Sequence, residues 1–388
     1  MPLELPTRHP IESPPGDSGV LPSQRLVKAV EDGLISAGEH FRIPPASIQP
    51  ASVDLRLGET AWPLQCSFLP DPDATVEDKV AGIALDEISI RDGAMLERGR
   101  PYLIPLMEHL ELPPDMRGKT NPKSSTGRLD VFTRVITDRN NRFDEIPAGY
   151  AGRLYLEVVP LSFAVRVERM LSLSQLRLSV GEAQLRDAEI REVHSEIPLL
   201  YTEAGPVTSE DLIVADGLFV SVDLSGDRAQ VAGFRSKRNS RVLDMAQIGS
   251  YDWRDFWEPV YPERGGHIIL EPESFYLLLS VEEVCVPPQY ASEMMAYDPT
   301  AGELRTHYAG FFDPGFGYDA EGRNHGSRAA LEVRVRDVPF MVEHRQAIGK
   351  LAFERMLEPP DRLYGGSGSH YQGQTSVLSK HFARDGGN

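Results

Sequence analysis

A short polar segment, Asn121–Leu129, carries three hydroxyl groups between two cations. Its sequence is NPKSSTGRL, so Lys123 and Arg128 flank a Ser-Ser-Thr triplet. A turn of this type can present backbone N–H groups and hydroxyls to an anion, especially where it opens a helical turn. Ser124 and Arg128 are four residues apart and would share one face of that turn. The segment therefore predicts an anion-binding turn, with a solvated polar loop as the alternative.

Two glutamates lie inside apolar stretches that have the composition of strands. Glu332 occurs in the sequence ALEV, and Glu157 occurs in the similar sequence LYLEVV. Burying a carboxylate is costly unless a partner or a reaction uses it, so both residues are candidates for proton transfer. Each can instead point to the solvent face of its strand.

Three further motifs have both a chemical and a plain interpretation. In HYAGFFDPGFG, residues 307–317, Asp313 opens a Pro-Gly turn, and Phe316 can either line a slot for a flat base or pack the hairpin. The tail GGSGSHYQGQ, residues 365–374, is a flexible linker or a flap over a phosphate. In IQPASVDLRLG, residues 48–58, the plain interpretation is a strand with Asp54 in a turn.

Composition limits the classes of partner. The chain has 388 residues, 41% of them hydrophobic and 25% charged, and a formal net charge of −18. This acidic balance argues against salt-driven binding to long nucleic acid, although a small anion remains possible where local cations or Mg²⁺ gather. No apolar run approaches the length of about 20 residues that a membrane span needs. The Pro-rich start has no signal-peptide pattern and indicates a poorly ordered arm over residues 1–20.

The two cysteines, Cys66 and Cys285, lie far apart in the sequence. A disulfide framework is therefore not expected, and a reducing cytoplasm fits best. We expect both thiols to be buried small hydrophobic groups.

The chain contains an internal repeat. Tyr102–Leu112 and Tyr276–Val286 are both apolar stretches that turn acidic and end in Pro-Pro, at an offset of 276 − 102 = 174. Glu157 and Glu332 lie in matching stretches at an offset of 332 − 157 = 175. The sequence SVDL at residues 52–55 returns at residues 221–224, at an offset of 169. We infer a tandem duplication, with domains at residues 21–200 and 201–388.

Each copy has the composition of a β domain. Stretches rich in β-branched residues are punctuated by Pro, Gly and polar residues, which predicts many short strands in a barrel or sandwich. The clearest helix spans Pro22–Leu34, where Ser23 can cap the start and Leu26, Val27 and Val30 recur at helical spacing.

In their order, these motifs resemble those of the dCTP deaminase and dUTPase superfamily, and they resemble the two-domain dCTP deaminases most. IQPASVDLRLG is similar to the first family motif, and PKSSTGRL is similar to the Ser-Ser…Arg motif on the phosphate side. AGFFDPGFG followed by ALEV resembles the nucleobase hairpin and its glutamate. GKLAFE and the YQGQ tail resemble the last two motifs, so the likeness covers roughly residues 20–380. The resemblance implies two dUTPase-like distorted β-barrels of jelly-roll type.

The resemblance also implies hydrolytic deamination of dCTP to dUTP and ammonia, a step that feeds dUMP and dTTP synthesis. Family deaminases use no zinc, and this sequence lacks the His-x-Glu and Pro-Cys-x-x-Cys pattern of the zinc enzymes. A glutamate must then take the proton of the attacking water. By resemblance this base is Glu332, with Glu157 as the alternative, while Ser124 and Arg128 position the water and stabilise charge.

The remaining site residues are assigned by the same likeness. The backbone of Ala309 would read the base, within a hairpin that also holds Asp313 and Phe316. Mg²⁺ is expected to arrive with the triphosphate rather than perform the hydrolysis. The candidates for contacts with the phosphates are Lys123, Ser125, Tyr371 and Gln374.

The two copies keep complementary parts of the motif set. The second copy has Asp298–Glu303, with an acid at the end, where the first has KSSTGR, and the first copy lacks the Phe-Asp-Pro-Gly hairpin. Family sites form between the subunits of a trimer. We therefore expect a site that is shared across domains, within one chain or between chains, and a homo-oligomer that is a trimer or a pseudo-hexamer.

Two other functions remain open at this stage. A bifunctional deaminase and dUTPase, or a plain dUTPase, would use overlapping motifs and aim water at the α-phosphate. A nucleotide-binding regulator without catalysis would explain the motifs that each copy has lost. The complementary pattern of loss favours the deaminase.

Overall fold

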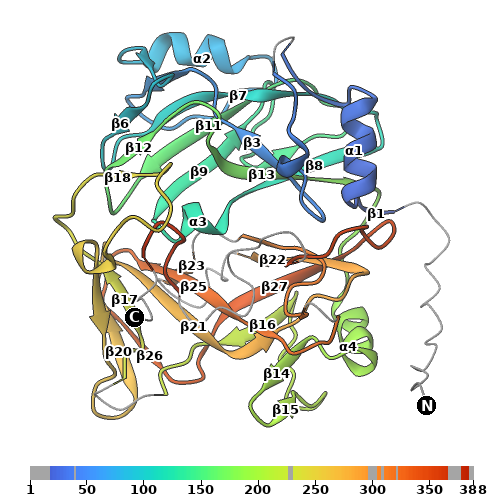
Figure 1. Ribbon diagram of the computed structural model, residues 1–388, viewed down its shortest axis with the longest axis vertical. Coiled ribbons are helices and arrows are strands. Elements are labelled where there is room, and N and C mark those ends of the chain that lie inside the picture. The colour runs from blue at the N-terminus through green and yellow to red at the C-terminus, as the bar shows by residue number, and fades with distance from the viewer. Residues whose placement is uncertain are drawn as a thin grey trace.

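The computed structural model describes residues 18–38, 41–225, 230–295, 304–306 (backbone alone), 310–319, 322–365 and 377–383. The molecule is built mainly from β-strands, with the first copy stacked on the second (Figure 1). The prediction of a mainly β chain is confirmed.

The first copy contains two main sheets. In one, β1 (Gly19–Val20), β13 (Ser172–Val180), β8 (Met116–Pro122) and β10 (Glu145–Ile146) follow in order, with β3 (Val53–Arg56) also on β13. In the other, the order is β5 (Ile88–Ser89), β4 (Thr60–Pro63), β7 (Tyr102–Glu111), β11 (Ala151–Pro160) and β9 (Val131–Ile136), with β2 (Ile35–Ala37) on β7.

The second copy repeats this plan. One sheet has the order β15 (Gly205–Pro206), β14 (Leu200–Thr202), β21 (Phe275–Val284), β17 (Gly233–Ser236) and β19 (Trp257–Val260), with β25 (Ser327–Val335) between β21 and β23 (Leu304–Thr306). The other has the order β16 (Leu218–Ser221), β27 (Ala347–Arg355), β22 (Tyr290–Met295) and β24 (Phe311–Phe312).

Smaller elements complete the fold. Two small sheets pair β20 (His267–Leu270) with β26 (Phe340–Glu343), and β12 (Val165–Val167) with both β6 (Ala94–Leu96) and β18 (Leu243–Asp244). The helices are α1 (Ser23–Glu31), α2 (Val76–Ile83), α3 (Ser124–Gly127) and α4 (Asp187–Glu196), with 3₁₀ turns η1 (Pro45–Ser47) and η2 (Trp253–Asp255).

The strand registers show the duplication directly. In the first copy Glu157 of β11 lies opposite Leu103 of β7, and in the second Glu332 of β25 lies opposite Leu277 of β21. The offsets are 332 − 157 = 175 and 277 − 103 = 174, which match the offsets of the sequence repeat. The two glutamates therefore hold equivalent positions.

One of the three sequence matches is wrong. Val53 pairs with Leu176, and Leu218 pairs with Leu351, so the structural offsets are 351 − 176 = 175 and 218 − 53 = 165. The counterpart of Val53 is therefore Leu218, four residues before the position that the repeated SVDL indicates. Because side chains alternate with a period of two, a shift of four keeps the same face inward and leaves no trace in the apolar pattern.

The apolar interiors of the two copies are joined. Phe163 of the first copy packs edge-to-face on Phe256 and Trp257, with ring centroids 5.4 and 5.3 Å apart. The second core includes Ile190 and Val193 of α4, a helix that precedes the expected boundary at residue 200. Aromatic pairs of this kind add stability beyond their buried area, so the copies pack as one body.

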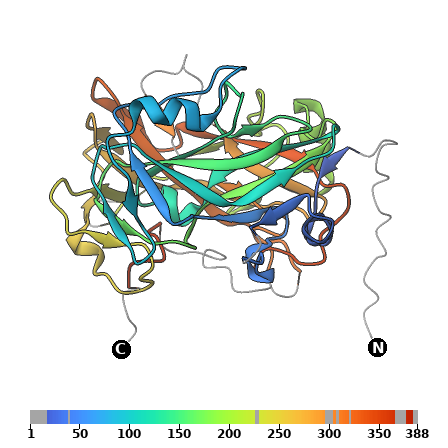
Figure 2. The same ribbon diagram turned by 90° about the horizontal axis from the view of Figure 1, so that it is seen from above.

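Helix α1 lies at one edge of the first copy in both views (Figures 1 and 2). It begins at Ser23, and Pro22 holds the N-cap position, so Ser23 is not the cap that the sequence suggested. Leu26 is buried and Val30 packs against the first core, but Val27 is 38% exposed. The apolar face is therefore narrower than predicted.

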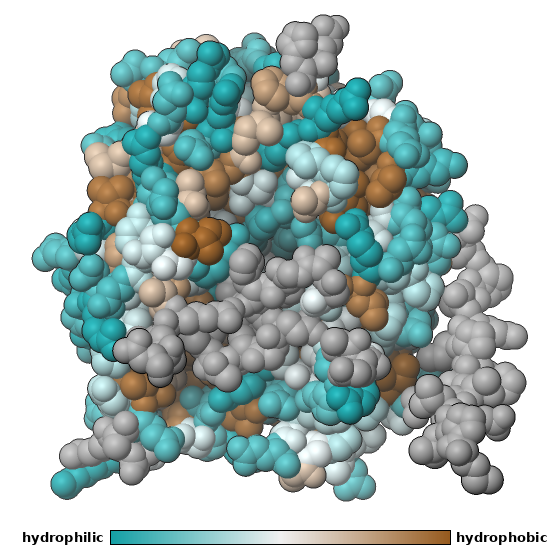
Figure 3. All heavy atoms as spheres, in the orientation of Figure 1, coloured by the Kyte–Doolittle hydropathy of each residue, from teal (hydrophilic) through white to brown (hydrophobic). Residues whose placement is uncertain are grey.

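The cysteine prediction holds for one residue of the two. Cys285 is buried and burial raises its pKa to about 12, whereas Cys66 is exposed. Cys66 follows the short strand β4 in a surface connection, where apolar neighbours do not enclose it. Hydrophilic residues cover most of the face in Figure 3, with apolar residues in separate patches. Among the described residues, no helix has the length and apolar character of a membrane span.

Candidate functional site

The segment that follows β8 forms the helical turn that the sequence suggested. The N–H groups of Thr126 and Gly127 donate to the carbonyl of Lys123, at 2.8 and 3.0 Å. Arg128 closes the turn by donating its N–H to the carbonyl of Ser124, at 3.1 Å. This turn, α3, projects from the first copy toward β23 and β25 of the second (Figure 1).

Arg128 and Glu332 lie within electrostatic range of each other across the domain interface, within one chain. The side chains belong to different copies, and the two residues are 4% and 5% exposed. Burial raises the pKa of the Glu332 carboxyl well above its ordinary value, the positive charge of Arg128 lowers it, and the charge of Asp130 raises it further. Among the described residues, Oε2 of Glu332 has no hydrogen-bond partner. A buried carboxyl of this kind, within electrostatic range of a guanidinium, is a candidate proton-transfer group.

A charge pair lies beside this contact. Arg334, two residues after Glu332 on β25, forms an ion pair with the fully buried Asp130 of the first copy. The hydroxyl of Ser162 also donates to Asp130, at 2.6 Å. Asp130 has a positive φ of 56°, a conformation that costs free energy in a residue other than glycine. The surrounding contacts hold Asp130 there, directly after the loop that carries Arg128.

The predicted hairpin lies against α3. A Cβ placed on Gly310 would lie only 2.9 Å from Oγ of Ser124, so a side chain at this position would crowd the serine. Two residues on, Phe312 packs edge-to-face on Phe316, whose centroid is 4.9 Å away. Phe316 is 4% exposed within the second core, where it packs the turn. We therefore leave Phe316 out of the groups that we propose to contact a nucleotide.

The described end of the tail is bound to the same turn. Arg128 donates from Nη1 to the carbonyl of Val377 at 3.1 Å, and the Ser379 hydroxyl donates to the carbonyl of Ser125 at 3.0 Å. Burial lowers the pKa of Lys380, and the nearby charge of Lys123 lowers it further. Two lysines in one electrostatic neighbourhood are suited to bind an anion.

Asp54 and Lys123 form an ion pair in this region. Asp54 lies within β3, rather than in a turn as the plain interpretation had it. Ala309, Tyr371 and Gln374 lie outside the described residues. The turn, the glutamate, the hairpin and the tail therefore converge as far as the structure describes them.

Glu157 has a different environment from Glu332. It is fully buried, and Arg134 on the neighbouring strand β9 donates to it from Nε at 2.9 Å. The Arg134 guanidinium also lies 3.6 Å from the ring centroid of Phe143 and donates to the hydroxyl of Ser67 at 2.8 Å. Oε2 of Glu157 is thus engaged by a side chain of its own domain, while its Oε1, like Oε2 of Glu332, has no hydrogen-bond partner among the described residues.

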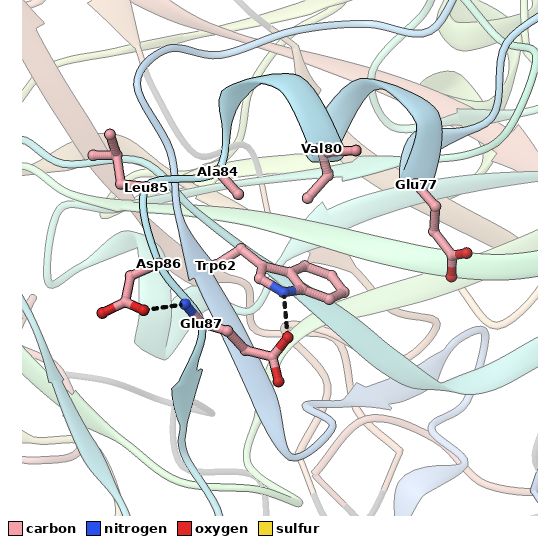
Figure 4. A pocket seen from close by; sticks show the side chains of 8 residues that line it. Trp62, Glu77, Val80, Ala84, Leu85, Asp86 and Glu87 are labelled. Carbon is pink, nitrogen blue, oxygen red and sulfur yellow. Dashed lines mark hydrogen bonds between the residues drawn. The ribbon is translucent and has the colours of Figure 1, made fainter.

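A surface hollow lies beside α2 (Figure 4). Its apolar wall includes Trp62, whose indole N–H donates to Glu87 at 3.1 Å. The lining also carries the carboxylates of Glu77 and Asp86, and it includes no cation among its described residues. A triphosphate would be repelled there, so this hollow is not the candidate site.

In the described part of the chain, no group of three or more His, Cys, Asp or Glu side chains is arranged to hold a metal ion.

Two family models together span nearly the whole chain. The N-terminal domain of 2'-deoxycytidine 5'-triphosphate deaminase matches residues 17–182, and the C-terminal domain matches residues 186–382. The chain belongs to the dCTP deaminase family.

Individual members of the dCTP deaminase family are similar to different extents. The crystal structure of 2'-deoxycytidine 5'-triphosphate deaminase from Agrobacterium tumefaciens is 44% identical, covers 89% of this chain and 100% of its own, and superposes with a TM-score of 0.80. A dUMP-forming dCTP deaminase of Parafrankia sp. is 31% identical over 42% of this chain and 77% of that protein. A dUMP-forming dCTP deaminase of Mycolicibacterium vanbaalenii is 30% identical over 36% of this chain and 71% of that protein.

Sequence reasoning missed several residues at the junction of the two copies. They are Asp130, Arg177, Arg334 and Lys380. Arg177 is the single arginine of β13, whereas Arg334 shares β25 with Arg328, so residue type alone gave little signal for either. Their partners are 136 and 204 residues away in sequence, so the pairing itself was not visible.

Proposed function

We propose that this chain deaminates dCTP to dUTP and ammonia at the junction of its two copies. The observation that carries the proposal is the buried carboxyl of Glu332 in one copy, which has Oε2 without a partner among the described residues and lies within electrostatic range of Arg128 from the other copy. The substrate class comes from the family and from the names of the similar proteins.

In the proposed reaction, Glu332 acts as general base and then as general acid. The carboxylate takes a proton from water, the water oxygen bonds to C4 of cytosine, and the C4–N4 bond breaks after Glu332 returns the proton to the leaving amine. A raised pKa suits this sequence, because the carboxylate then accepts the proton readily. Arg128 and Ser124 would hold the water and stabilise the charge that develops near C4.

The rest of the site would hold the nucleotide. We propose that Lys123 and Ser125, with Tyr371 and Gln374 of the tail, contact the triphosphate, and that Mg²⁺ enters on the phosphates. The hairpin of Ala309 and Asp313 would read the base. Support for this layout comes from the hydrogen bonds that join Val377 and Ser379 of the tail to the α3 turn.

The deciding experiment is product analysis with dCTP and Mg²⁺. Release of ammonia and dUTP without pyrophosphate supports the proposal. Tight binding of dCTP with no ammonia would instead make the protein a nucleotide-binding regulator. Parallel reactions with dCMP and CTP show whether the triphosphate and the 2'-deoxy sugar are required.

A second candidate is a bifunctional enzyme that continues to dUMP. Two of the similar proteins are named dUMP-forming dCTP deaminases, whereas the structure with 44% identity is named a deaminase alone. Release of pyrophosphate and ammonia in equal amounts in the same assay would favour the bifunctional enzyme. Pyrophosphate without ammonia, with dUTP as substrate, would indicate a plain dUTPase.

A further inference from the structure

Arg177 is a buried cation that crosses from the first copy to the second. It lies on β13 and is one of the largest fully buried side chains of the molecule, with 2% exposure. From Nη1 it donates to the carbonyl of Ser292 at 3.2 Å and to Oε2 of Glu354 at 3.0 Å. From Nη2 it donates to Oδ1 of Asp313, at 3.3 Å. Every one of these partners belongs to the second copy.

Arg177 also stacks on the hairpin. Its guanidinium carbon lies 3.9 Å from the centroid of the Phe311 ring. Arg177 therefore contacts both residues that flank Phe312 in the segment Phe311–Asp313. A planar guanidinium can stack on a ring while it donates in its own plane, a combination that an ammonium group does not offer.

The position of the hairpin depends on contacts such as those with Arg177, because the strand of the hairpin is short. β24 has only two residues, and its register with β22 consists of the pairs Ser292–Phe312 and Glu293–Phe311. At the start of the hairpin, Gly310 lies against Ser124 of α3. Two groups of the first copy, Arg177 and the α3 turn, therefore both contact the hairpin of the second copy.

We propose that Arg177 is a positioning residue that sets the selectivity of the site for the nucleobase. It fixes the Phe311–Asp313 segment against the α3 turn, and thereby fixes the backbone that faces the base. This inference rests on the proposed function, in which the hairpin reads cytosine. It assigns to Arg177 no contact with the substrate.

The test compares recognition of the base with recognition of the phosphates. Arg177→Met removes the charge and keeps most of the volume, and Arg177→Lys keeps the charge without the planar stack. Because a misplacement of about 1 Å can cost about 100-fold, we expect Arg177→Met to lower kcat/KM for dCTP by roughly that factor, mainly through KM. Arg177→Lys should recover part of the loss. Competitive inhibition by tripolyphosphate should change by less than about twofold, since the hairpin does not hold the phosphates.

A matched control separates positioning from stability. Arg355 forms an ion pair with Glu189 at 2.9 Å within the second copy, on the strand next to β22. Arg355→Met should keep the ratio of dCTP affinity to tripolyphosphate affinity unchanged. A purely structural role for Arg177 would weaken dCTP and tripolyphosphate together, and that result would overturn the proposal.

Failure of the proposed function can be told apart from failure of this inference. The wild-type chain is assayed first for ammonia release from dCTP. If it releases none, titration calorimetry of dCTP and tripolyphosphate on the wild type and on Arg177→Lys still measures base selectivity. Unchanged selectivity in both Arg177 variants would contradict the inference, whatever the wild-type activity.

Discussion

Glu332 and Glu157 hold the same position in two copies of one strand pair, yet they have different partners. Glu332 is under the electrostatic influence of Arg128 across the domain junction, and Glu157 accepts a hydrogen bond from Arg134 of its own sheet. We expect Glu332→Gln to lower kcat for dCTP by at least about 100-fold, because a general acid–base group typically contributes that much. Ammonia release measures it.

Glu157→Gln is the matched variant for this comparison. It should keep kcat within about threefold of the wild type, because the side chain that it replaces takes no part in the proposed proton transfer. Full activity in Glu332→Gln with loss in Glu157→Gln would reverse the assignment of the base.

The buried carboxyl of Glu332 also makes stability depend on pH. Because its pKa is raised in the folded state above the ordinary value of 4.5, the folded chain binds this proton more tightly than the unfolded chain does. The stability that Glu332 contributes is present below its unfolded pKa and is lost as the pH rises through the folded pKa. Glutamine does not titrate at this position. As the pH rises above about 5, the melting temperature of the wild type should therefore fall relative to that of Glu332→Gln.

Melting curves in pH steps measure this difference. Glu145→Gln serves as the control, because Glu145 lies in an exposed ion pair with Arg142. A gap between Glu332→Gln and wild type that stays constant from acid to neutral pH would show that the carboxyl is not perturbed by burial.

At the scale of the elements, the pair of Arg334 on β25 and Asp130 after α3 joins two sheets. Its side chains are 13% and 0% exposed. Removing one partner of a buried pair costs about 3 to 5 kcal/mol, since it leaves a charge without compensation. We expect Arg334→Met to lower the denaturation midpoint markedly, with partial recovery in the double variant with Asp130→Asn.

Arg142→Met is the control for the loss of the ion pair between Arg334 and Asp130. Arg142 and Glu145 are 68% and 54% exposed, and exposed pairs contribute at most about 1 kcal/mol. Equal denaturation midpoints for the Arg334→Met and Arg142→Met variants would show that the ion pair between Arg334 and Asp130 adds no stability.

Comparison of the elements with the sequence patterns shows which strands and helices those patterns predict. The β-branched residues in the stretches around Glu157 and Glu332 predict their strands, and the offset of 175 relates them correctly. The SVDL repeat misleads, because four matching letters do not fix a register. Helix α2 was not predicted, although Thr75 and Asp78 form a capping box at its start, a pattern that the sequence displays.

The candidate site was predictable in part for a physical reason. Ser124, Arg128 and Glu332 follow from residue type and local spacing, together with the family likeness. Their meeting within one chain does not follow, because it depends on how two domains pack, and the packing is set by distant aromatic contacts such as Phe163 with Trp257. Arg177 was invisible for the same reason, since its role exists only across the junction.

At the scale of the whole molecule, the net charge of −18 opposes a triphosphate. Long-range repulsion should make binding depend on Mg²⁺, which neutralises part of the nucleotide charge. We expect EDTA to raise KM for dCTP by at least about tenfold, with kcat nearly unchanged, and added Mg²⁺ to restore it. Initial rates at constant ionic strength measure the effect. An unchanged KM in EDTA would remove magnesium from the proposal.

The ion pair that joins Asp130, after α3, to Arg334 of β25 has a consequence for how the chain behaves on dilution. Both halves of the contact are covalently joined, so their effective concentration is fixed by the chain and not by the amount of protein in solution. A site assembled from separate subunits loses activity below the dissociation constant of the assembly. Here the turnover per chain should stay constant down to the lowest concentration that an assay can follow, whatever larger assembly the chains form.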